Sequence, residues 1–126
     1  MKELINTSGA PDPIGPYNQA VKAGGFLFVS GQIAIDPASG ALVQTDIAAE
    51  AHQVMQNLGA ILRAAGLDYR HIVKTTIFLR TMEDFAAVNA VYGSYFEGEY
   101  PARETVAVAG LPKQVNVEIS VIALAQ

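Results

Sequence analysis

Apolar residues recur at steps of three and four along the stretch from Thr45 to Ala65. This spacing places them on one side of a helix, so the pattern predicts an amphipathic helix with one buried stripe. Thr45 or Asp46 can cap its start by accepting a backbone hydrogen bond, and Gly66 can end it in the left-handed conformation. The stripe comprises Ile47, Ala51, Val54, Leu58, Ile61, Leu62 and Ala65.

A second stretch with helical spacing runs from Met82 to Phe96. Its apolar positions also fall on one side of a helix, as expected for an element that packs on a core. Thr81 and Asp84 stand three residues apart at its start and form a weaker variant of the capping box, because aspartate is shorter than glutamate. The stripe comprises Phe85, Val88, Tyr92, Tyr95 and Phe96.

Five extended runs accompany these two helices. They are rich in β-branched and aromatic residues, which favour strands. Gly24-Gly25 suits a tight hairpin turn between the first two runs, and prolines make residues 9–17 an ordered loop. The order β-β-α-β-α-β-β predicts an α+β fold, with a sheet of five to six strands and two helices packed on one face. The runs are Gln19–Ala23, Phe26–Ile35, His71–Arg80, Thr105–Ala109 and Asn116–Leu124.

Side chains alternate across a strand, so each run also predicts what lies on the second face of the sheet. In the last run, Val115, Val117, Ile119, Val121 and Ala123 point one way, and Asn116, Glu118, Ser120, Ile122 and Leu124 point the other. In the second run, Leu27, Val29, Gly31 and Ile33 oppose Phe28, Ser30 and Gln32. The second face is therefore mixed, which is typical of an oligomer interface that lines a binding cleft. We infer a homo-oligomer with its site between subunits.

Composition narrows the class of protein. The chain has 126 residues, of which 51% are apolar and 16% charged, and we interpret residues 1–126 as a single domain. A formal charge of −4 without any basic cluster argues against binding to nucleic acid. The chain has no cysteine, which excludes disulfides and thiolate chemistry, and it lacks an apolar stretch typical of a signal peptide or membrane span. We expect a cytoplasmic protein without membrane contact.

Two side chains stand out as candidates for chemistry. Arg103 in YPARETV comes just before a predicted strand, and a turn at Pro101 would aim its guanidinium along the mixed face, where its planar fork suits a carboxylate. A surface arginine with a solvated head is the alternative. Glu118 interrupts the apolar alternation of VNVEISVIAL, where a glutamate is costly to bury unpaired. It is either functional or structural, as a buried ion pair or a carboxylate at the rim.

Other polar residues give weaker signals. Tyr17 follows the proline-rich loop and offers a hydroxyl, although loop tyrosines more often simply pack. Ser30-Gly31 lacks the setting of a nucleophilic serine, but the glycine would let the backbone approach an anion. His52 and His71 are nineteen residues apart, a poor spacing for a metal site, so we interpret them as exposed or capping.

Taken in order, several segments resemble the Rid/YjgF family of enamine and imine deaminases over essentially the whole chain. They are IGPYNQAV, FVSGQIAIDPASG, HIVKTTIFL, VNAVY, YPAR and VEISVIAL. The similarity is to the RidA branch in particular, and it implies a homotrimer with a chorismate-mutase-like fold and ligand clefts between adjacent subunits. It also implies hydrolysis of short 2-imino acids, such as those formed from 2-aminoacrylate and 2-aminocrotonate, to 2-keto acids and ammonia. No cofactor or metal is implied.

The resemblance assigns roles to individual residues. The family's carboxylate-binding arginine falls on Arg103, and its glutamate near the hydrolytic water falls on Glu118. Further substrate-binding positions fall on Tyr17, Ser30, Gly31 and Asn89. Two positions depart from the common pattern, since Thr105 replaces a frequent cysteine and Glu104 replaces a small residue. Main-chain groups are used at the cysteine position, so the resemblance implies that Thr105 keeps this substrate contact, whereas Glu104 adds negative charge nearby.

Other functions stay open on the sequence. A non-catalytic module that senses 2-keto acids would use the same arginine clamp. Ribonuclease activity or translation inhibition has been attributed to some relatives, but the acidic composition argues against tight binding of RNA. A chorismate mutase would rest on the fold alone and would need several cations around a dianion, and the chain offers few near the expected cleft.

Overall fold

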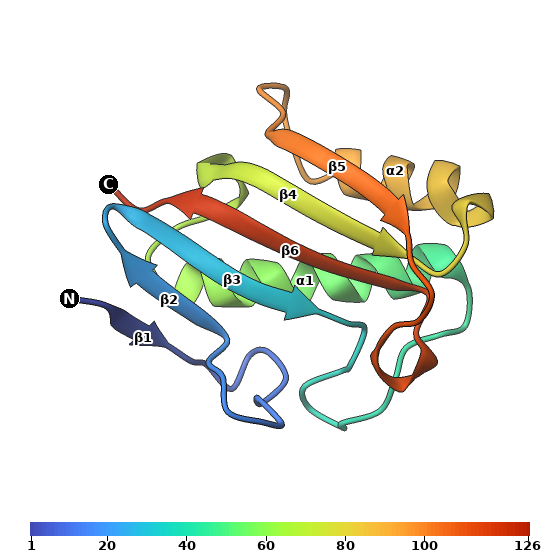
Figure 1. Ribbon diagram of the computed structural model, residues 1–126, viewed down its shortest axis with the longest axis horizontal. Helices are drawn as coiled ribbons and strands as arrows, with labels where there is room; N and C mark the ends of the chain where they lie inside the picture. The colour runs from blue at the N-terminus through green and yellow to red at the C-terminus, as the bar shows by residue number, and fades with distance from the viewer.

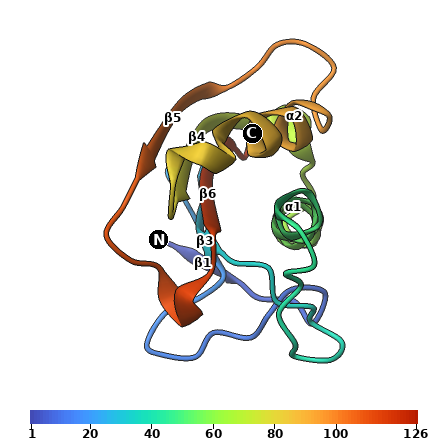
Figure 2. The same cartoon turned by 90° about the vertical axis from the view of Figure 1, so that its right-hand side faces the viewer.

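The computed structural model describes all 126 residues and contains a sheet of six strands with two α-helices on one side (Figure 1, Figure 2). The strands are β1 Glu3–Ile5, β2 Ala20–Ala23, β3 Phe26–Gln32, β4 Ile72–Leu79, β5 Ala102–Ala107 and β6 Val117–Leu124. The α-helices are α1 Ile47–Ala64 and α2 Phe85–Gly93. Short 3-10 helices occupy the connections: η1 Tyr69–His71, η2 Met82–Asp84 and η3 Pro112–Gln114.

The strands lie in the order β1-β2-β3-β6-β4-β5, so the last strand of the chain occupies the middle of the sheet. All neighbouring pairs are antiparallel except β4 and β5, which are parallel and are connected through α2. Both α-helices cover the same face, and the other face carries no α-helix (Figure 2). The predicted α+β sheet with two helices on one side is therefore confirmed.

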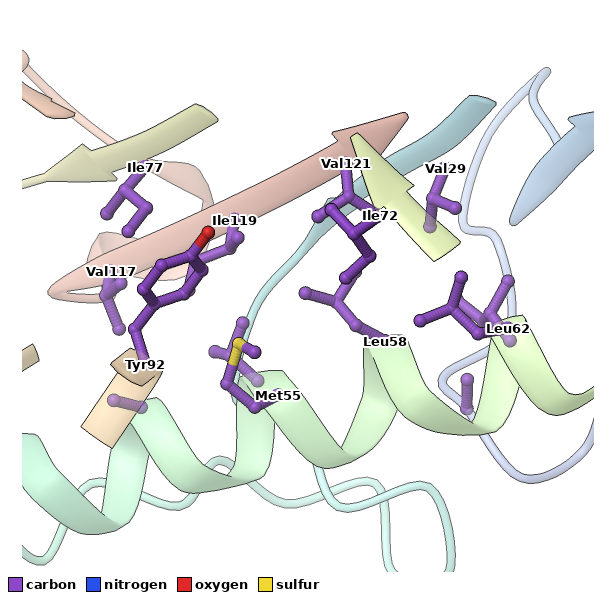
Figure 3. Packing of buried hydrophobic residues seen from close by; sticks show 14 of the residues in the cluster. Val29, Met55, Leu58, Leu62, Ile72, Ile77, Tyr92, Val117, Ile119 and Val121 are labelled. Carbon is purple, nitrogen blue, oxygen red and sulfur yellow. The ribbon is translucent and has the colours of Figure 1, made fainter. Parts of the chain in front are cut away.

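Helix α1 supplies one wall of the hydrophobic core (Figure 3). Its side chains Met55, Leu58 and Leu62 are completely buried and point toward the sheet, where Val29 and Val121 are also buried. Removing such a side chain from water stabilises the folded state by about 1.5–3 kcal/mol. This packing fixes β3 and β6, the two strands whose second faces carry candidate site residues.

The ends of α1 follow the sequence closely. The Asp46 side chain caps the start by accepting a 2.7 Å hydrogen bond from the backbone N–H of Ala49. At the other end Gly66 has a φ of +78°, and the N–H of Leu67 donates to the carbonyl of Leu62. A left-handed residue at this position lets the final carbonyls find donors, as predicted from the glycine. Helix α1 is thus held at both ends by local bonds.

Several predicted boundaries were wrong. Strand β1 was missed because it has only three residues, too few for an alternation to show. Helix α2 ends at Gly93, and its predicted first turn is the separate helix η2. The capping box does not form, because Thr81 accepts from the N–H of Glu83 and the Asp84 side chain makes no cap bond. An aspartate is shorter than the glutamate that reaches back in a capping box. Strand β5 begins three residues early, at Ala102, and β3 ends at Gln32.

A β-bulge in β3 corrects the predicted alternation of this strand. The register against β6 shifts between Val29 and Gln32, so that Gln32 is buried beside Leu27 and Val29 while Gly31 is exposed. An extra residue in one strand reverses the sides of all residues beyond it. Gly31 therefore lies on the second face of the sheet, not in the core as the simple alternation predicts.

The second face is mixed in character, as predicted. Phe28 and Leu124 are 46% and 41% exposed on it. Glu104 also lies there, with its carboxylate 3.4 Å from the Lys74 ammonium and 3.2 Å from the Thr76 hydroxyl. Apolar side chains of this size are in contact with solvent on a face that also holds an ion pair, which is the pattern expected of a surface that meets another protein copy.

Candidate active site

Arg103 lies on β5 and faces the helices rather than the second face of the sheet. It pairs with Thr75 of β4, and Thr75 is completely buried on the helix side. Directly paired residues share a face, so the prediction that the guanidinium runs along the mixed face was wrong. The error followed from placing Arg103 before the strand, whereas β5 already includes it.

Helix α2 holds the guanidinium of Arg103 in place. The Arg103 Nη1 group donates a hydrogen bond to Asn89 Oδ1. The guanidinium carbon lies 5.7 Å from the ring centre of Phe85 and 5.4 Å from that of Tyr92. These three residues are four and three positions apart, so one face of α2 presents all of them to the arginine. A guanidinium stacked on aromatic rings is both oriented and attracted to them.

Strand β4 fixes the Tyr92 side chain. Its hydroxyl donates a 2.8 Å hydrogen bond to the Thr75 hydroxyl, and both residues are buried. Burial raises the pKa of the Tyr92 phenol above its ordinary value, so the ring remains neutral. Beside the guanidinium of Arg103 lies an open cavity of about 460 Å³, which we call the arginine hollow. It is lined by Asn89, Tyr92, Gly93, Tyr100, Pro101 and Arg103.

Glu118 lies on the opposite side of the sheet. It pairs with Phe78 of β4, which stands between the buried residues Ile77 and Leu79, so Phe78 and Glu118 both point to the second face of the sheet. The Glu118 carboxylate is half-buried and makes no hydrogen bond or ion pair in the chain, and this burial raises its pKa above the ordinary value. A carboxylate that is partly desolvated and unpaired is a stronger base than one in water.

Gly31 makes room for this glutamate. A Cβ atom added at Gly31 would lie 2.9 Å from the carboxyl carbon of Glu118. Any larger residue would displace the carboxylate, so the glycine at the bulge serves the close approach of Glu118. The surrounding cavity, which we call the glutamate hollow, has a volume of about 250 Å³. It is lined by Pro11, Asp12, Ile14, Tyr17, Gln19, Gly31, Gln32, Ile33, Ile35, Pro112, Lys113 and Glu118.

The remaining predicted residues fall in different places. Tyr17 is about half exposed and lines the glutamate hollow. The Ser30 hydroxyl donates a 2.7 Å hydrogen bond to the carbonyl of Asn18, so it secures the segment next to Tyr17. Thr105 pairs with Ile77 on the helix side, two residues beyond Arg103, and its hydroxyl oxygen is buried without a partner. It lines neither hollow.

The histidines were interpreted correctly. His71 Nδ1 accepts a 3.1 Å hydrogen bond from the N–H of Asp68 and completes a capping box at η1. His52 is exposed, with its Nδ1 2.9 Å from the Tyr95 hydroxyl.

No group of three His, Asp or Glu side chains is arranged to hold a metal ion. Neither helix is long and apolar enough to cross a membrane.

The sequence reasoning missed some contributors to both hollows. Phe85 and Tyr92 belonged to the predicted core stripe of the second helix, and nothing in a helical stripe distinguishes a ring that supports a cation from one that only packs. Gln19 was not singled out, although it is 1% exposed in the structure. A lone polar residue at the start of an apolar strand was the available signal.

The candidate residues therefore form two groups within one chain. Arg103 and Asn89 belong to the arginine hollow, and Tyr17, Gly31 and Glu118 belong to the glutamate hollow. The two hollows open on opposite faces of the sheet, because Arg103 pairs with Thr75 and Glu118 with Phe78. One copy of the chain does not place the arginine and the glutamate around the same small molecule.

The chain is similar to known proteins over nearly its entire length. Residues 7–125 match the family described as Endoribonuclease L-PSP. The mouse protein 2-iminobutanoate/2-iminopropanoate deaminase is 47% identical over 98% of this chain and 92% of its own, while other curated relatives carry only a RutC family name.

Two solved structures show the same fold. That of YyfA from Yersinia pestis, described as a conserved Rid family protein of unknown function, is 48% identical with a TM-score of 0.95 over 98% of both chains. That of E. coli TdcF with bound serine is 42% identical with a TM-score of 0.93 over 97% of this chain and 98% of its own. The match in sequence and in structure shows that this chain belongs to the Rid/YjgF family.

Proposed function

We propose that the protein hydrolyses reactive 2-imino acids, the tautomers of 2-aminoacrylate and 2-aminocrotonate, to 2-keto acids and ammonia. The observation that carries this proposal is the fixed guanidinium of Arg103, which is held by Asn89, Phe85 and Tyr92 at the mouth of an open cavity. A fixed planar fork of donors is suited to a carboxylate. The deaminase name of the mouse relative and the serine bound to TdcF support the same ligand class.

The proposed site is shared between subunits of a homotrimer. The separation of Arg103 and Glu118 onto opposite faces supports this arrangement, because a second copy is needed to bring an arginine hollow to a glutamate hollow. The mixed second face supports self-association. The number three is an expectation from the family. Light scattering tests it: a mass near that of one chain at micromolar concentration would contradict the shared site.

The chemistry needs few groups. Arg103 binds the carboxylate of the substrate and so holds the imine carbon close to an ordered water molecule, which lowers the entropic part of the barrier. Glu118 of the adjoining copy takes a proton from this water as its oxygen bonds to the imine carbon, and it passes this proton to the nitrogen, which gives a carbinolamine. The regenerated carboxylate then takes the hydroxyl proton of the carbinolamine and delivers it to the same nitrogen. The carbon–nitrogen bond then breaks, ammonia leaves, and the carbonyl of the 2-keto acid forms. No step requires a cofactor or metal.

A coupled assay tests the proposed activity. A pyridoxal-phosphate dehydratase acting on serine or threonine supplies the enamine, and the formation of 2-keto acid is followed with and without this protein. We expect faster formation when the protein is present. If the rate is unchanged while 2-ketobutyrate still binds, a sensing module is the better assignment. A ribonuclease is disfavoured, because each hollow is lined by a single cation, Arg103 or Lys113.

A further inference from the structure

Gln19 is a buried amide within the IGPYNQAV segment, and neither the fold nor the proposed reaction accounts for it. We propose that Gln19 is a positioning residue that fixes the loop from Pro11 to Tyr17, and that its effect on the ligand passes through Tyr17. This inference rests on the proposed function, since it explains how one wall of the glutamate hollow is kept in place.

The amide of Gln19 is bonded on both sides. Its Oε1 accepts a 2.7 Å hydrogen bond from the N–H of Thr7. Its Nε2 lies 2.8 Å from the Pro11 carbonyl, 3.0 Å from the Thr7 carbonyl and 3.3 Å from the Ala10 carbonyl. The two amide hydrogens therefore serve three acceptors. Gln19 is 1% exposed, so these bonds replace all of its contacts with water.

The segment that Gln19 holds has few other bonds of its own. Residues 6–19 form no helix or strand, and prolines at positions 11, 13 and 16 lack the N–H donor. Within residues 7–11, the backbone bond from Ala10 to Thr7 is long, at 3.4 Å. The Thr7 hydroxyl accepts from the N–H of Gly9, and the Gln19 amide supplies the donors for the carbonyls of this irregular path. Carbonyls that are removed from water without a donor are costly, so these bonds of Gln19 stabilise the path.

Gln19 also anchors the other end of the loop. Its backbone carbonyl accepts a 2.9 Å hydrogen bond from the N–H of Ser30, and the Ser30 hydroxyl donates to the neighbouring carbonyl of Asn18. The side chain of Gln19 thus fixes Pro11, and its backbone fixes the residues that follow Tyr17. Pro11 and Tyr17 both line the glutamate hollow. Gln19 thus bonds residues at both ends of the loop, beside Asn6, whose side chain bonds Asn18 and the N–H of Gln19, and Tyr17 lies between these ends.

If Gln19 only filled space in the core, a different residue would be expected. An apolar side chain of the same length would fill this place in the core without the cost of removing an amide from water. The amide is needed because the loop carbonyls must be satisfied. The consequence is specific: loss of the amide should release the Tyr17 loop before it disturbs the sheet.

A double-mutant cycle tests this coupling. Gln19→Met keeps the length of the side chain and removes its hydrogen bonds; we expect kcat/KM for the imine to fall by about 10- to 100-fold, as small misplacements do. Tyr17→Ala should cause a loss of similar size. If Gln19 acts through Tyr17, the double variant resembles Tyr17→Ala alone. Multiplied losses in the double variant would overturn the proposal.

Amide hydrogen exchange supplies a readout that does not depend on activity. We expect residues 7–18 to exchange at least about 10-fold faster in Gln19→Met, while the sheet stays protected. Tyr69→Phe is the matched control, because it removes another partly buried bond, from the Tyr69 hydroxyl to the Met55 carbonyl, that involves no loop residue. Unchanged exchange of the loop in Gln19→Met would contradict the proposal.

Two precautions keep the result decisive. If Gln19→Met does not fold, Gln19→Glu takes its place, since it keeps the acceptor for Thr7 and loses at least one donor. Failure of the proposed function would show itself separately, as a wild-type protein that neither hydrolyses the imine nor binds 2-ketobutyrate. In that case the exchange of residues 7–18 alone decides whether Gln19 fixes the loop.

Discussion

The arginine hollow and the glutamate hollow are built in different ways. In the arginine hollow, the functional groups stand on a strand and a helix, and the spacing of Phe85, Asn89 and Tyr92 on α2 places them around Arg103. The glutamate hollow is walled mainly by irregular segments: the loop from Pro11 to Tyr17, the bulge at Gly31 and the turn η3. Regular elements orient groups by their periodicity, whereas irregular segments need separate bonds to hold them.

Those separate bonds are visible around the glutamate hollow. The Asn57 amide donates to the carbonyls of Ile33 and Ile35, and Arg80 Nη1 donates to the carbonyl of Gln114. In η3, Lys113 and Gln114 have left-handed φ angles of 54° and 56°, a conformation that costs energy in residues other than glycine. One half of the proposed site is therefore held by secondary structure, and the other half by hydrogen bonds from side chains to loop carbonyls.

The largest expected effect comes from removing the base in the glutamate hollow. Glu118→Gln keeps the shape of the side chain but cannot accept a proton, so hydrolysis of the imine should fall by about 10²- to 10⁴-fold while 2-ketobutyrate still binds. The coupled assay and titration calorimetry measure the two effects. A variant that hydrolyses at the parental rate would make Glu118 structural.

The pH dependence of the same residue supplies a control. Burial raises the pKa of Glu118. The pH below which the hydrolysis rate falls should therefore lie above the usual pKa range of a glutamate, and this fall should be absent in Glu118→Gln. Because the folded state favours the protonated carboxyl, the free energy of unfolding should fall as pH rises through this pKa. The Gln variant should lack that fall in urea titrations.

Removing the clamp in the arginine hollow should affect binding as well as hydrolysis. Arg103→Ala loses a charge-assisted contact of about 1.5–3 kcal/mol, so we expect affinity for 2-ketobutyrate to drop by about 10- to 100-fold and hydrolysis to drop with it. Arg103→Lys should recover little, because a point charge does not reproduce the planar fork. Retained affinity in Arg103→Ala would show that the carboxylate binds elsewhere.

Mixing the two variants tests whether the hollows of different copies work together. Arg103→Ala and Glu118→Gln chains carry different tags, are co-expressed, and mixed oligomers are isolated by both tags. In a mixed trimer, about one site in three should pair an intact arginine with an intact glutamate, giving about one third of the parental activity. Mixed oligomers that are as inactive as the two single-variant proteins would show that each copy uses only its own residues.

The smallest effect is expected from crowding the bulge. Gly31→Ala brings a Cβ within 2.9 Å of the Glu118 carboxyl carbon, so the carboxylate must shift, and hydrolysis should fall by about 10-fold or less with carboxylate binding retained. Gly110→Ala is a matched control, since an added Cβ there meets no atom within 4 Å. Equal activity of both variants would mean that the position of Glu118 is not critical.

The sequence predicts the regular parts of this molecule well. Helix α1 has a long stripe and clear end signals, so its span differs from the predicted one by two residues at its start and one at its end. The sequence also pointed to Glu118, a charged residue in an apolar alternation, and to Arg103, a planar donor group between the Pro101 turn and a strand. It could not place them on opposite faces, because the start of β5 depends on pairing with β4, which no local pattern records.

The ordered loop over residues 9–17 was predicted correctly, but the bulge and the bonds that order this loop escaped prediction for a related reason. Alternation assumes an unbroken strand, and the extra residue near Gly31 reverses the faces of everything after it. The path of residues 7–11 depends on an amide that is distant in the chain, so composition could indicate an ordered loop but not what orders it.

The position of β6 has a consequence for biosynthesis. This strand follows the other five in the chain, yet it lies between β3 and β4 and pairs with both. While the chain is being synthesised, β3 and β4 have no partner on their facing edges until residues 117–124 have left the ribosome. The two halves of the sheet are therefore joined only after β6 has been translated. A nascent chain that stalls before β6 presents the unpaired edges of β3 and β4 to chaperones or to other nascent chains.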